Sequence, residues 1–165
     1  VSQYVKSKCD VPVVWGGIHA STLPRQTLEN ENIDFVVEGE GELIFPKLLK
    51  CIENDGDFSK LNKIWYNQSG EIKKGTSPFG NEEALDLNSL NKLPYHLLNV
   101  NDYKGKGSAH SGRAFLVETG RGCPRRCSYC YNTSFNENSW RTASAEKIIE
   151  SIIELQKWIA SFIKC

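Results

Sequence analysis

The sequence predicts an α/β protein that consists of two pieces, and three observations support this prediction. Two short apolar runs, Val11–Trp15 and Ile33–Val37, each end in a glycine-containing turn that leads toward a helix. Three cysteines, Cys123, Cys127 and Cys130, lie within one loop, and a strongly amphipathic segment follows them. Because strands that alternate with helices favour parallel sheets, we expect a doubly wound sheet first. The first strand, loop and helix of a parallel α/β barrel should come after it.

The first strand and turn lie within residues 1–60, which we assign to one domain. Val11–Trp15 is typical of a short buried strand, and Gly16 and Gly17 follow it as a tight turn. Pro24 suits the first position of the helix that comes next. A glycine pair after a strand is most often only a turn, although ligands of doubly wound sheets also bind at this place.

The second strand of this domain, Ile33–Val37, is rich in β-branched residues and ends at the acidic run Glu38, Glu40 and Glu42. This run is by default a solvated loop that enters a helix, since carboxylates suit the positive end of a helix dipole. A helix is predicted from about Glu42 to Asn54. Its apolar residues recur on one face: Leu43, Ile44, Leu48, Leu49 and Ile52.

Residues 61–112 are predicted to form a hairpin and a linker. Ile64–Asn67 and Glu71–Lys73 are two short strand-like runs joined by a turn that contains glycine. A polar stretch with several glycine, proline and asparagine residues follows from Lys74 to Pro94, as is typical of a linker.

Residues 113–165 hold the second piece. Phe115–Thr119 is predicted to be a short buried strand, and Gly120–Gly122 to be the turn that leaves it. After the cysteine loop, Ser144 is a favourable N-cap for a helix with Glu146 in its first turn. The apolar stripe of this helix is predicted to cover a barrel: Ile148, Ile149, Ile152, Ile153, Leu155, Ile159 and Phe162.

The spacing of Cys123, Cys127 and Cys130 indicates a metal centre, because three thiols at this spacing can converge on one point. Thiolates are the soft ligands that both zinc and iron–sulfur clusters use. A structural zinc site is closed by four protein ligands, and the loop holds no fourth cysteine or histidine. A four-iron cluster held by three cysteines keeps one iron open for a substrate or cofactor. We therefore interpret the loop as a catalytic iron–sulfur site.

The cysteine pattern, with the aromatic Tyr129 before the last cysteine, resembles the signature of the radical S-adenosylmethionine (SAM) superfamily. The resemblance implies that Cys123, Cys127 and Cys130 hold a [4Fe-4S] cluster. It also implies that SAM chelates the open iron and that Tyr129 helps to seat the adenine of SAM. The stretch from Glu118 to Glu150 is similar to the subgroup of this family that carries an N-terminal cobalamin-binding domain.

The first 60 residues resemble the C-terminal part of a Rossmann-like cobalamin-binding domain. Gly16 and Gly17 match the paired glycines that let the cobalamin tail pass close to the backbone in that family. By the same resemblance, Gly39 and Glu40 are expected to contact cobalamin at the neighbouring turn. The family motif Asp-x-His-x-x-Gly, which supplies the cobalt-ligating histidine, is expected to precede Val1, so whether cobalt has a protein ligand stays open.

The family resemblance implies an enzyme that cleaves SAM reductively and generates a 5′-deoxyadenosyl radical. Methyl transfer from cobalamin to an unactivated carbon of a small molecule is the expected reaction, and a related rearrangement is the alternative within the family. The resemblance also implies an electron donor such as flavodoxin or ferredoxin. No catalytic residue is assigned. Because the chain contains no methionine and begins in mid-pattern, we expect a fragment that is inactive alone.

The charge balance and the remaining cysteines bear on the partners, the compartment and one alternative function. The 165 residues include 20 basic and 20 acidic ones, so the net charge of zero indicates no nucleic-acid or membrane partner. Single cysteines at Cys9, Cys51 and Cys165 fit a reducing cytoplasm better than a disulfide framework. The alternative is a non-catalytic zinc or iron–sulfur module, whose fourth ligand would come from elsewhere: Cys9, Cys51, His96, His110 or Cys165.

Overall fold

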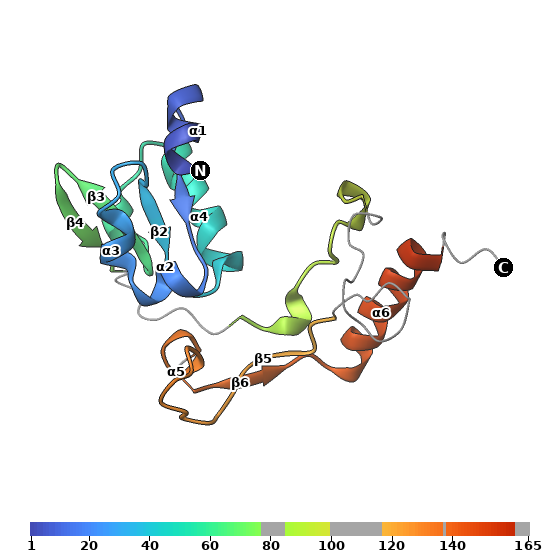
Figure 1. Ribbon diagram of the computed structural model, residues 1–165. Helices are drawn as coiled ribbons and strands as arrows, with labels where there is room; N and C mark the ends of the chain where they lie inside the picture. Colours follow the sequence, from blue (N-terminus) through green and yellow to red (C-terminus); the bar gives the residue numbers. More distant parts are fainter. Residues whose placement is uncertain (77–84, 100–116, 137, 161–165) are drawn as a thin grey trace. The chain divides into compact units, whose positions relative to one another are not determined.

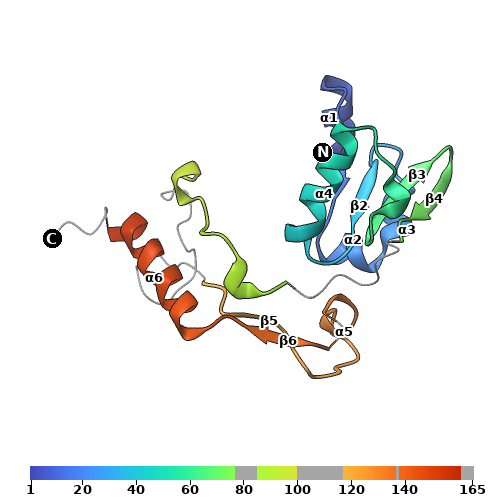
Figure 2. The same ribbon diagram turned by 180° about the vertical axis from the view of Figure 1, so that it is seen from behind.

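The computed structural model describes residues 1–76, 85–99, 117–136 and 138–160. The chain forms two compact units, one of residues 1–85 and 123–139, the other of residues 86–122 and 140–165. The predicted domain boundaries, after residues 60 and 112, stay a prediction. Figures 1 and 2 show the elements of each unit from opposite sides.

The first unit is built on a four-stranded sheet with the strand order β1-β2-β3-β4. The strands β1 (Val14–Trp15) and β2 (Phe35–Val37) are parallel, as predicted. The hairpin of β3 (Ile64–Gln68) and β4 (Glu71–Lys74) was also predicted. This hairpin continues the sheet, because β3 pairs antiparallel with β2.

Helices cover both faces of this sheet because successive residues of β2 point to opposite sides. Phe35 and Val37 pack in one apolar core with Ile44 and Leu48 of α4 (Gly41–Glu53). Val36 packs on the other face in a second core. This second core includes Ala20 of α2 (Ile18–Thr22) and Leu28 of α3 (Pro24–Leu28), together with Ile33. Figure 2 shows α4 on one side of β2 and α2 and α3 on the other.

The predicted helices of this unit are confirmed, and unpredicted ones are added. α4 lies within one residue of its predicted bounds, and Pro24 begins α3 as expected. The helix α1 (Ser2–Lys8) and the one-turn helix α2 carry no apolar period long enough to predict. A short 3-10 helix, η1 (Phe58–Lys60), leads into β3.

The second unit contains the antiparallel strands β5 (Gly120–Gly122) and β6 (Trp140–Thr142) and the helix α6 (Ala145–Ala160). The prediction of a turn at Gly120–Gly122 was wrong. Residues 117–119 are not a strand, and Phe115 lies outside the described residues. A Cβ on Gly120 would lie 2.8 Å from the carbonyl oxygen of Arg141, so glycine here permits close strand pairing.

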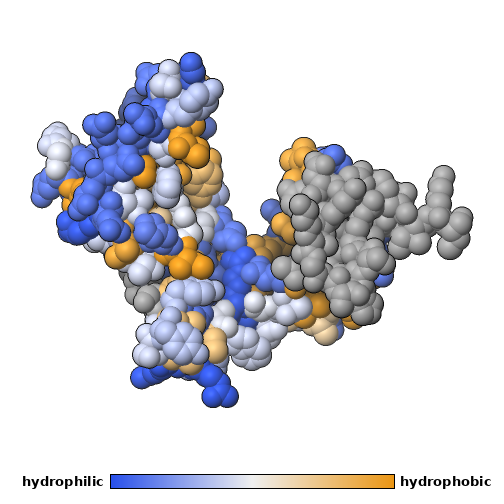
Figure 3. All heavy atoms as spheres, in the orientation of Figure 1, coloured by the Kyte–Doolittle hydropathy of each residue, from blue (hydrophilic) through white to orange (hydrophobic). Residues whose placement is uncertain are grey.

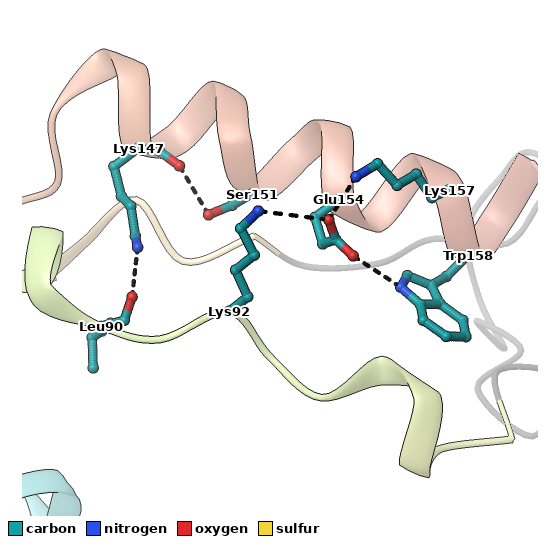
Figure 4. Close-up of polar contacts among 7 residues, drawn as sticks. All are labelled: Leu90, Lys92, Lys147, Ser151, Glu154, Lys157 and Trp158. Atoms are coloured by element: carbon teal, nitrogen blue, oxygen red, sulfur yellow. Dashed lines mark hydrogen bonds and ion pairs between the residues drawn. The ribbon is translucent and has the colours of Figure 1, made fainter.

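α6 begins as predicted, because the hydroxyl of Ser144 accepts a hydrogen bond from the backbone N–H of Lys147 (3.2 Å). A segment with two short 3-10 helices, η2 (Leu87–Ser89) and η3 (Tyr95–Leu97), runs along it. Figure 4 shows this segment joined to α6 by Lys147, which donates to the carbonyl of Leu90, and by Lys92, which pairs with Glu154.

The observed elements confirm the predicted α/β class with its parallel strand pair. Within the described part of the chain, no helix is long and apolar enough to cross a membrane. Several apolar side chains are nevertheless partly exposed on the first unit, and Figure 3 shows such residues in orange among polar ones. The exposed large apolar side chains of this unit include Trp15, Ile18, Leu43, Phe45 and Leu49.

Candidate metal and cofactor sites

A cavity of about 330 Å³ opens at the carboxyl ends of the two parallel strands β1 and β2. The turn residues Gly16 and Gly17 line it from one strand and Gly39 from the other. Because parallel strands end at the same edge of a sheet, the two predicted glycine turns are brought together here. Glu40 is not among the lining residues. The remaining wall is largely apolar and includes Trp15, Val37, Phe45 and Pro46.

Gly17 faces open space at this cavity, and its backbone adopts a conformation reserved for glycine. Its dihedral angles are φ 89° and ψ −172°, a region that residues with a Cβ avoid. A Cβ on Gly17 would meet no atom within 4 Å, so a side chain would extend into unfilled space. A Cβ on Gly16 would make only ordinary contact with Val37, 3.7 Å from its carbonyl oxygen. A side chain at Gly17 would therefore occupy part of the cavity.

The two glycine turns are tied together by Ser21, which the sequence did not single out. The backbone N–H of Gly39 donates a 2.8 Å hydrogen bond to the hydroxyl oxygen of Ser21 on α2. Gly39 itself has a positive φ of 81°. The bond joins α2, which follows Gly17, to the turn after β2.

Glu38, expected to be a solvated loop residue, is instead part of a side-chain cluster at the end of β2. It accepts a hydrogen bond from the indole of Trp65, and Lys74 forms a 2.8 Å ion pair with it. The same indole lies under two cations, 5.3 Å from Arg25 and 5.2 Å from Lys74. This cluster fixes the end of β2 against β3 and β4.

The three cysteines lie in the loop 123–139, which connects β5 to β6. The thiols of Cys123, Cys127 and Cys130 are free and partly buried. The described residues contain no group of three cysteine, histidine or acidic side chains close enough to hold a metal ion. The thiols therefore do not form a preassembled ligand set, and binding a metal would require them to converge.

The chemistry of this loop nevertheless fits a soft metal or an iron–sulfur cluster. From Cys123 to Asn136 the only side chains that bind metals strongly are the three thiols, since the stretch holds no histidine or carboxylate. Arg125 and Arg126 stand between the first two cysteines, where their charges suit a centre made negative by thiolates.

The backbone of this loop is held by short-range hydrogen bonds. The N–H of Cys130 donates to the carbonyl of Cys127 (3.1 Å), and the hydroxyl of Thr133 donates to the carbonyl of Cys130 (2.8 Å). The side-chain amide of Asn132, at the start of α5 (Asn132–Phe135), donates to the carbonyl of Cys123 (2.8 Å). Sequence reasoning missed this role of Asn132, because a bond across nine residues leaves no periodic pattern.

Tyr129, expected to seat adenine, has a side chain that is 91% exposed. It lies between two of the cysteines, and the structure gives it no packing role in the described residues. Within the first unit, α5 contacts α2, the helix that begins directly after Gly17 (Figures 1 and 2). The cysteine loop and the glycine-lined edge therefore belong to the same compact unit.

The residues considered as a fourth metal ligand in the alternative function lie in environments of their own. Cys9 is exposed, and Cys51 packs at the end of α4 against Gly56, where a Cβ would lie 2.8 Å from its sulfur. The ring of His96 lies 6.5 Å from that of Trp158 on α6. His110 and Cys165 lie outside the described residues.

Comparison with known proteins extends over most of this chain. No protein-family model matches the sequence. An uncharacterized methyltransferase of Pyrococcus horikoshii, PH0819, is 31% identical over 148 residues, which cover 87% of this chain and 30% of the relative. The cobalamin-dependent radical SAM methyltransferase TokK of Streptomyces tokunonensis is 29% identical over 97% of this chain and 23% of its own length. The chain thus spans less than a third of these relatives.

Solved structures give the same result for the fold. The cobalamin-dependent SAM radical enzyme OxsB, described with aqua-cobalamin and SAM bound, matches with a TM-score of 0.72 and 21% identity. The match covers 98% of this chain and 21% of OxsB. The radical SAM methyltransferase TsrM of Kitasatospora setae matches with a TM-score of 0.70 and 22% identity, over 95% of this chain and 30% of TsrM. Over the segment that it spans, the chain is thus similar to cobalamin-dependent radical SAM enzymes in sequence and in fold.

Proposed function

We propose that this chain contributes the junction between the cobalamin site and the iron–sulfur site of a cobalamin-dependent radical SAM enzyme. The observation that carries the proposal is the presence of both candidate sites in one compact unit. A glycine-lined cavity lies at the ends of β1 and β2, and a loop with three free thiols contacts the helix that follows the first glycine turn.

In this proposal the three thiols of Cys123, Cys127 and Cys130 bind a [4Fe-4S] cluster. When bound, this cluster supplies the one electron that splits SAM into methionine and a 5′-deoxyadenosyl radical. The chain's own residues orient the site: Gly122, at φ 84°, turns the backbone into Cys123, and the exposed Tyr129 is available to cover the adenine of SAM.

The cavity at Gly16, Gly17 and Gly39 would hold part of the cobalamin in the same proposal. Its glycines leave space beside the backbone, and the side chains of Trp15 and Phe45 give that space an apolar wall. Glu40 follows Gly39 directly and would contact the cofactor at the rim. A methyl group carried by cobalamin is then available to a substrate radical, which makes methyl transfer the reaction that we propose.

Substrate, electron donor and compartment are also proposals. The substrate is a small molecule with an unactivated carbon, and the electron comes from a donor of the flavodoxin or ferredoxin class. The five described cysteines are all free thiols, which supports the reducing cytoplasm as the compartment.

Anaerobic reconstitution with iron and sulfide tests the iron–sulfur half of this proposal. The chain should take up iron and sulfide and develop visible absorption, and added SAM should change the paramagnetic spectrum of the reduced cluster. Replacing Cys123, Cys127 or Cys130 by alanine should abolish stable uptake. The matched controls are Cys9→Ala and Cys51→Ala, which should bind iron as the unchanged chain does.

Two results would contradict this half of the proposal. Tightly bound zinc without iron uptake would support a structural metal module instead. Loss of iron in Cys51→Ala equal to that in Cys127→Ala would do the same, because it would identify a fourth protein ligand.

A further inference from the structure

Asn132 is a buried amide that joins the two ends of the cysteine-containing segment. Its side chain is only 6% exposed. The amide nitrogen Nδ2 donates to the carbonyl oxygen of Cys123 (2.8 Å), and the oxygen Oδ1 accepts from Nδ2 of Asn136 (2.8 Å). The orientation of the amide is fixed by these partners, since a backbone carbonyl can only accept.

The bond from Asn132 to Cys123 closes a ring of chain that contains all three cysteines. Cys123 is held at one end of this ring, and Cys130 stands two residues before the other end. Two further bonds, from Cys130 to Cys127 and from Thr133 to Cys130, hold the carbonyls of the other two cysteines. The backbone of the ring is thus fixed, although the thiols have not converged.

A metal that gathers its ligands from one loop must order that loop, which costs conformational entropy. A backbone that is already held by hydrogen bonds lowers this cost. The side chain of Asn132 is well suited to this role because its Nδ2 donates to Cys123 within the ring, while its Oδ1 accepts from Asn136 beyond the ring. An aspartate has the same shape but no N–H, so it would place a carboxylate oxygen against the carbonyl oxygen of Cys123. The interaction at Cys123 therefore depends on the amide nitrogen and not on the size of the side chain.

We propose that Asn132 is a positioning residue for the metal centre, which sets the position of Cys123 relative to Cys127 and Cys130. This inference rests on the proposed metal-binding function of the three cysteines. Asn132 does not touch the metal in this proposal and acts only through the backbone of Cys123.

The test uses cobalt(II) as a probe, because its thiolate complexes absorb visibly without cluster assembly, SAM or activity. The chain is titrated anaerobically with cobalt(II) in four forms: unchanged, Asn132→Asp, Asn132→Ser and Ser139→Ala. The serine hydroxyl is too short to reach the carbonyl, and it adds no charge. Ser139→Ala is the matched control, since it removes a hydroxyl of the same loop that donates to the carbonyl of Asn136 (2.6 Å) and not to Asn132 or a cysteine.

We expect Asn132→Asp and Asn132→Ser to weaken cobalt(II) binding on the order of tenfold or more, as loss of outer-shell support does at metal sites. Ser139→Ala should change the affinity much less. After reconstitution with iron, both Asn132 variants should also show shifted g-values in the paramagnetic spectrum of the reduced cluster. Far-UV circular dichroism checks that each variant is folded.

The outcomes separate this inference from the proposed function. Cobalt(II) affinity and g-values of folded Asn132→Ser that equal those of the unchanged chain would overturn the positioning role while leaving the cluster proposal intact. An equal loss in Ser139→Ala would also overturn it, because the effect would then be general to the loop. An unchanged chain that binds neither cobalt(II) nor iron would overturn the proposed function, and this inference with it.

Discussion

The two glycines at the cavity edge differ in how strongly their positions require glycine. Gly16 and Gly17 are adjacent in the chain and line the same cavity, yet only Gly17 has a positive φ. The resemblance to the cobalamin-binding family assigned both glycines one role, closeness to a ligand. The structure adds a second requirement at Gly17, which concerns the backbone and applies even without a ligand.

Gly17→Ala should therefore destabilise the first unit by about 1–3 kcal/mol, the usual range for a residue forced into this backbone region. Gly16→Ala is the matched control and should have a much smaller effect, since its Cβ makes ordinary contact with Val37. Urea unfolding of the two variants measures the difference. Equal midpoints would show that the turn relaxes to accept a side chain.

The cysteines outside the loop also differ in their environment. Burial raises the pKa of the Cys51 thiol, and the negative charge of Asp57 raises it further. We expect iodoacetamide to modify the exposed Cys9 faster than Cys51 at mildly alkaline pH, because the thiolate is the reactive form. Asp57→Asn should accelerate the modification of Cys51. Rates determined by mass spectrometry that are equal for both cysteines would contradict this prediction.

At the scale of elements, the two glycine turns act as a pair because of one hydroxyl. Ser21 on α2 accepts the hydrogen bond of Gly39 at the end of β2, 18 residues away in the sequence. Ser21→Ala should lower the free energy of unfolding by about 1 kcal/mol, a typical value for one hydrogen bond. Thermal unfolding followed by circular dichroism measures this loss.

Thr22→Ala provides the control for Ser21→Ala. The hydroxyl of Thr22 donates to the carbonyl of Ile18 within α2, at an exposed position. If Thr22→Ala lowered the stability as much as Ser21→Ala, the Ser21 hydroxyl would stabilise the helix α2 itself. Its hydrogen bond with Gly39 would then not be the cause.

The segment along α6 is held by charges that respond to pH. Hydrogen bonds from Lys157 and then Trp158 hold the pKa of Glu154 below its usual range, and the charges of Lys157 and Lys92 add to the effect. Because the folded pKa is lowered, the stabilisation from Glu154 is complete above the usual glutamate value. It is lost as the pH falls through the lowered one.

We expect Glu154→Gln to reduce the melting temperature at about pH 7 and to have a smaller effect near pH 3, because the carboxylate of Glu154 takes up a proton as the pH falls through its lowered pKa. Differential scanning calorimetry at both pH values measures this. A melting-temperature difference that does not shrink on acidification would show that the ion pairs drawn in Figure 4 contribute nothing.

At the scale of the whole molecule, the two apolar cores formed by the described residues of the first unit contain no residue of the cysteine loop. Both cores are built from the sheet and its helices, with Leu28, Val36, Leu48 and Ile64 almost completely buried. The sheet should therefore stay folded when metal is removed, in contrast to small zinc modules that unfold without their metal.

An iron chelator should accordingly remove the metal from the reconstituted chain without reducing its far-UV circular dichroism by more than a small fraction. The measurement compares spectra and thermal unfolding before and after chelation. Loss of most secondary structure together with the iron would contradict the proposed catalytic site and favour the structural module.

Much of the fold could be predicted because it depends on local periodicity. The apolar period of residues 42–54 and the N-cap at Ser144 predicted α4 and α6, and the β-branched run Ile33–Val37 predicted β2. The strand at Gly120–Gly122 could not be predicted. Its glycines resemble a turn in sequence, and only the approach of Arg141 from β6 shows why they pair.

The residues of the candidate sites likewise include some that could be predicted and some that could not. Gly16, Gly17 and Gly39 could be placed at one edge because the ends of parallel strands meet. Asn132 and Ser21 could not be found, because each acts through one hydrogen bond to a backbone group distant in the sequence. Such bonds follow from the folded positions of two segments and leave no mark in composition or spacing.

The order of strands in the sheet also determines where a further strand could join. Among the described residues, β1 and β4 are the two edges of the sheet. β4 carries the charges of Glu71, Lys73 and Lys74, which oppose edge-to-edge association, whereas β1 consists of Val14 and Trp15. A strand presented to this sheet would therefore pair beside β1, and the hairpin closes the opposite side against aggregation.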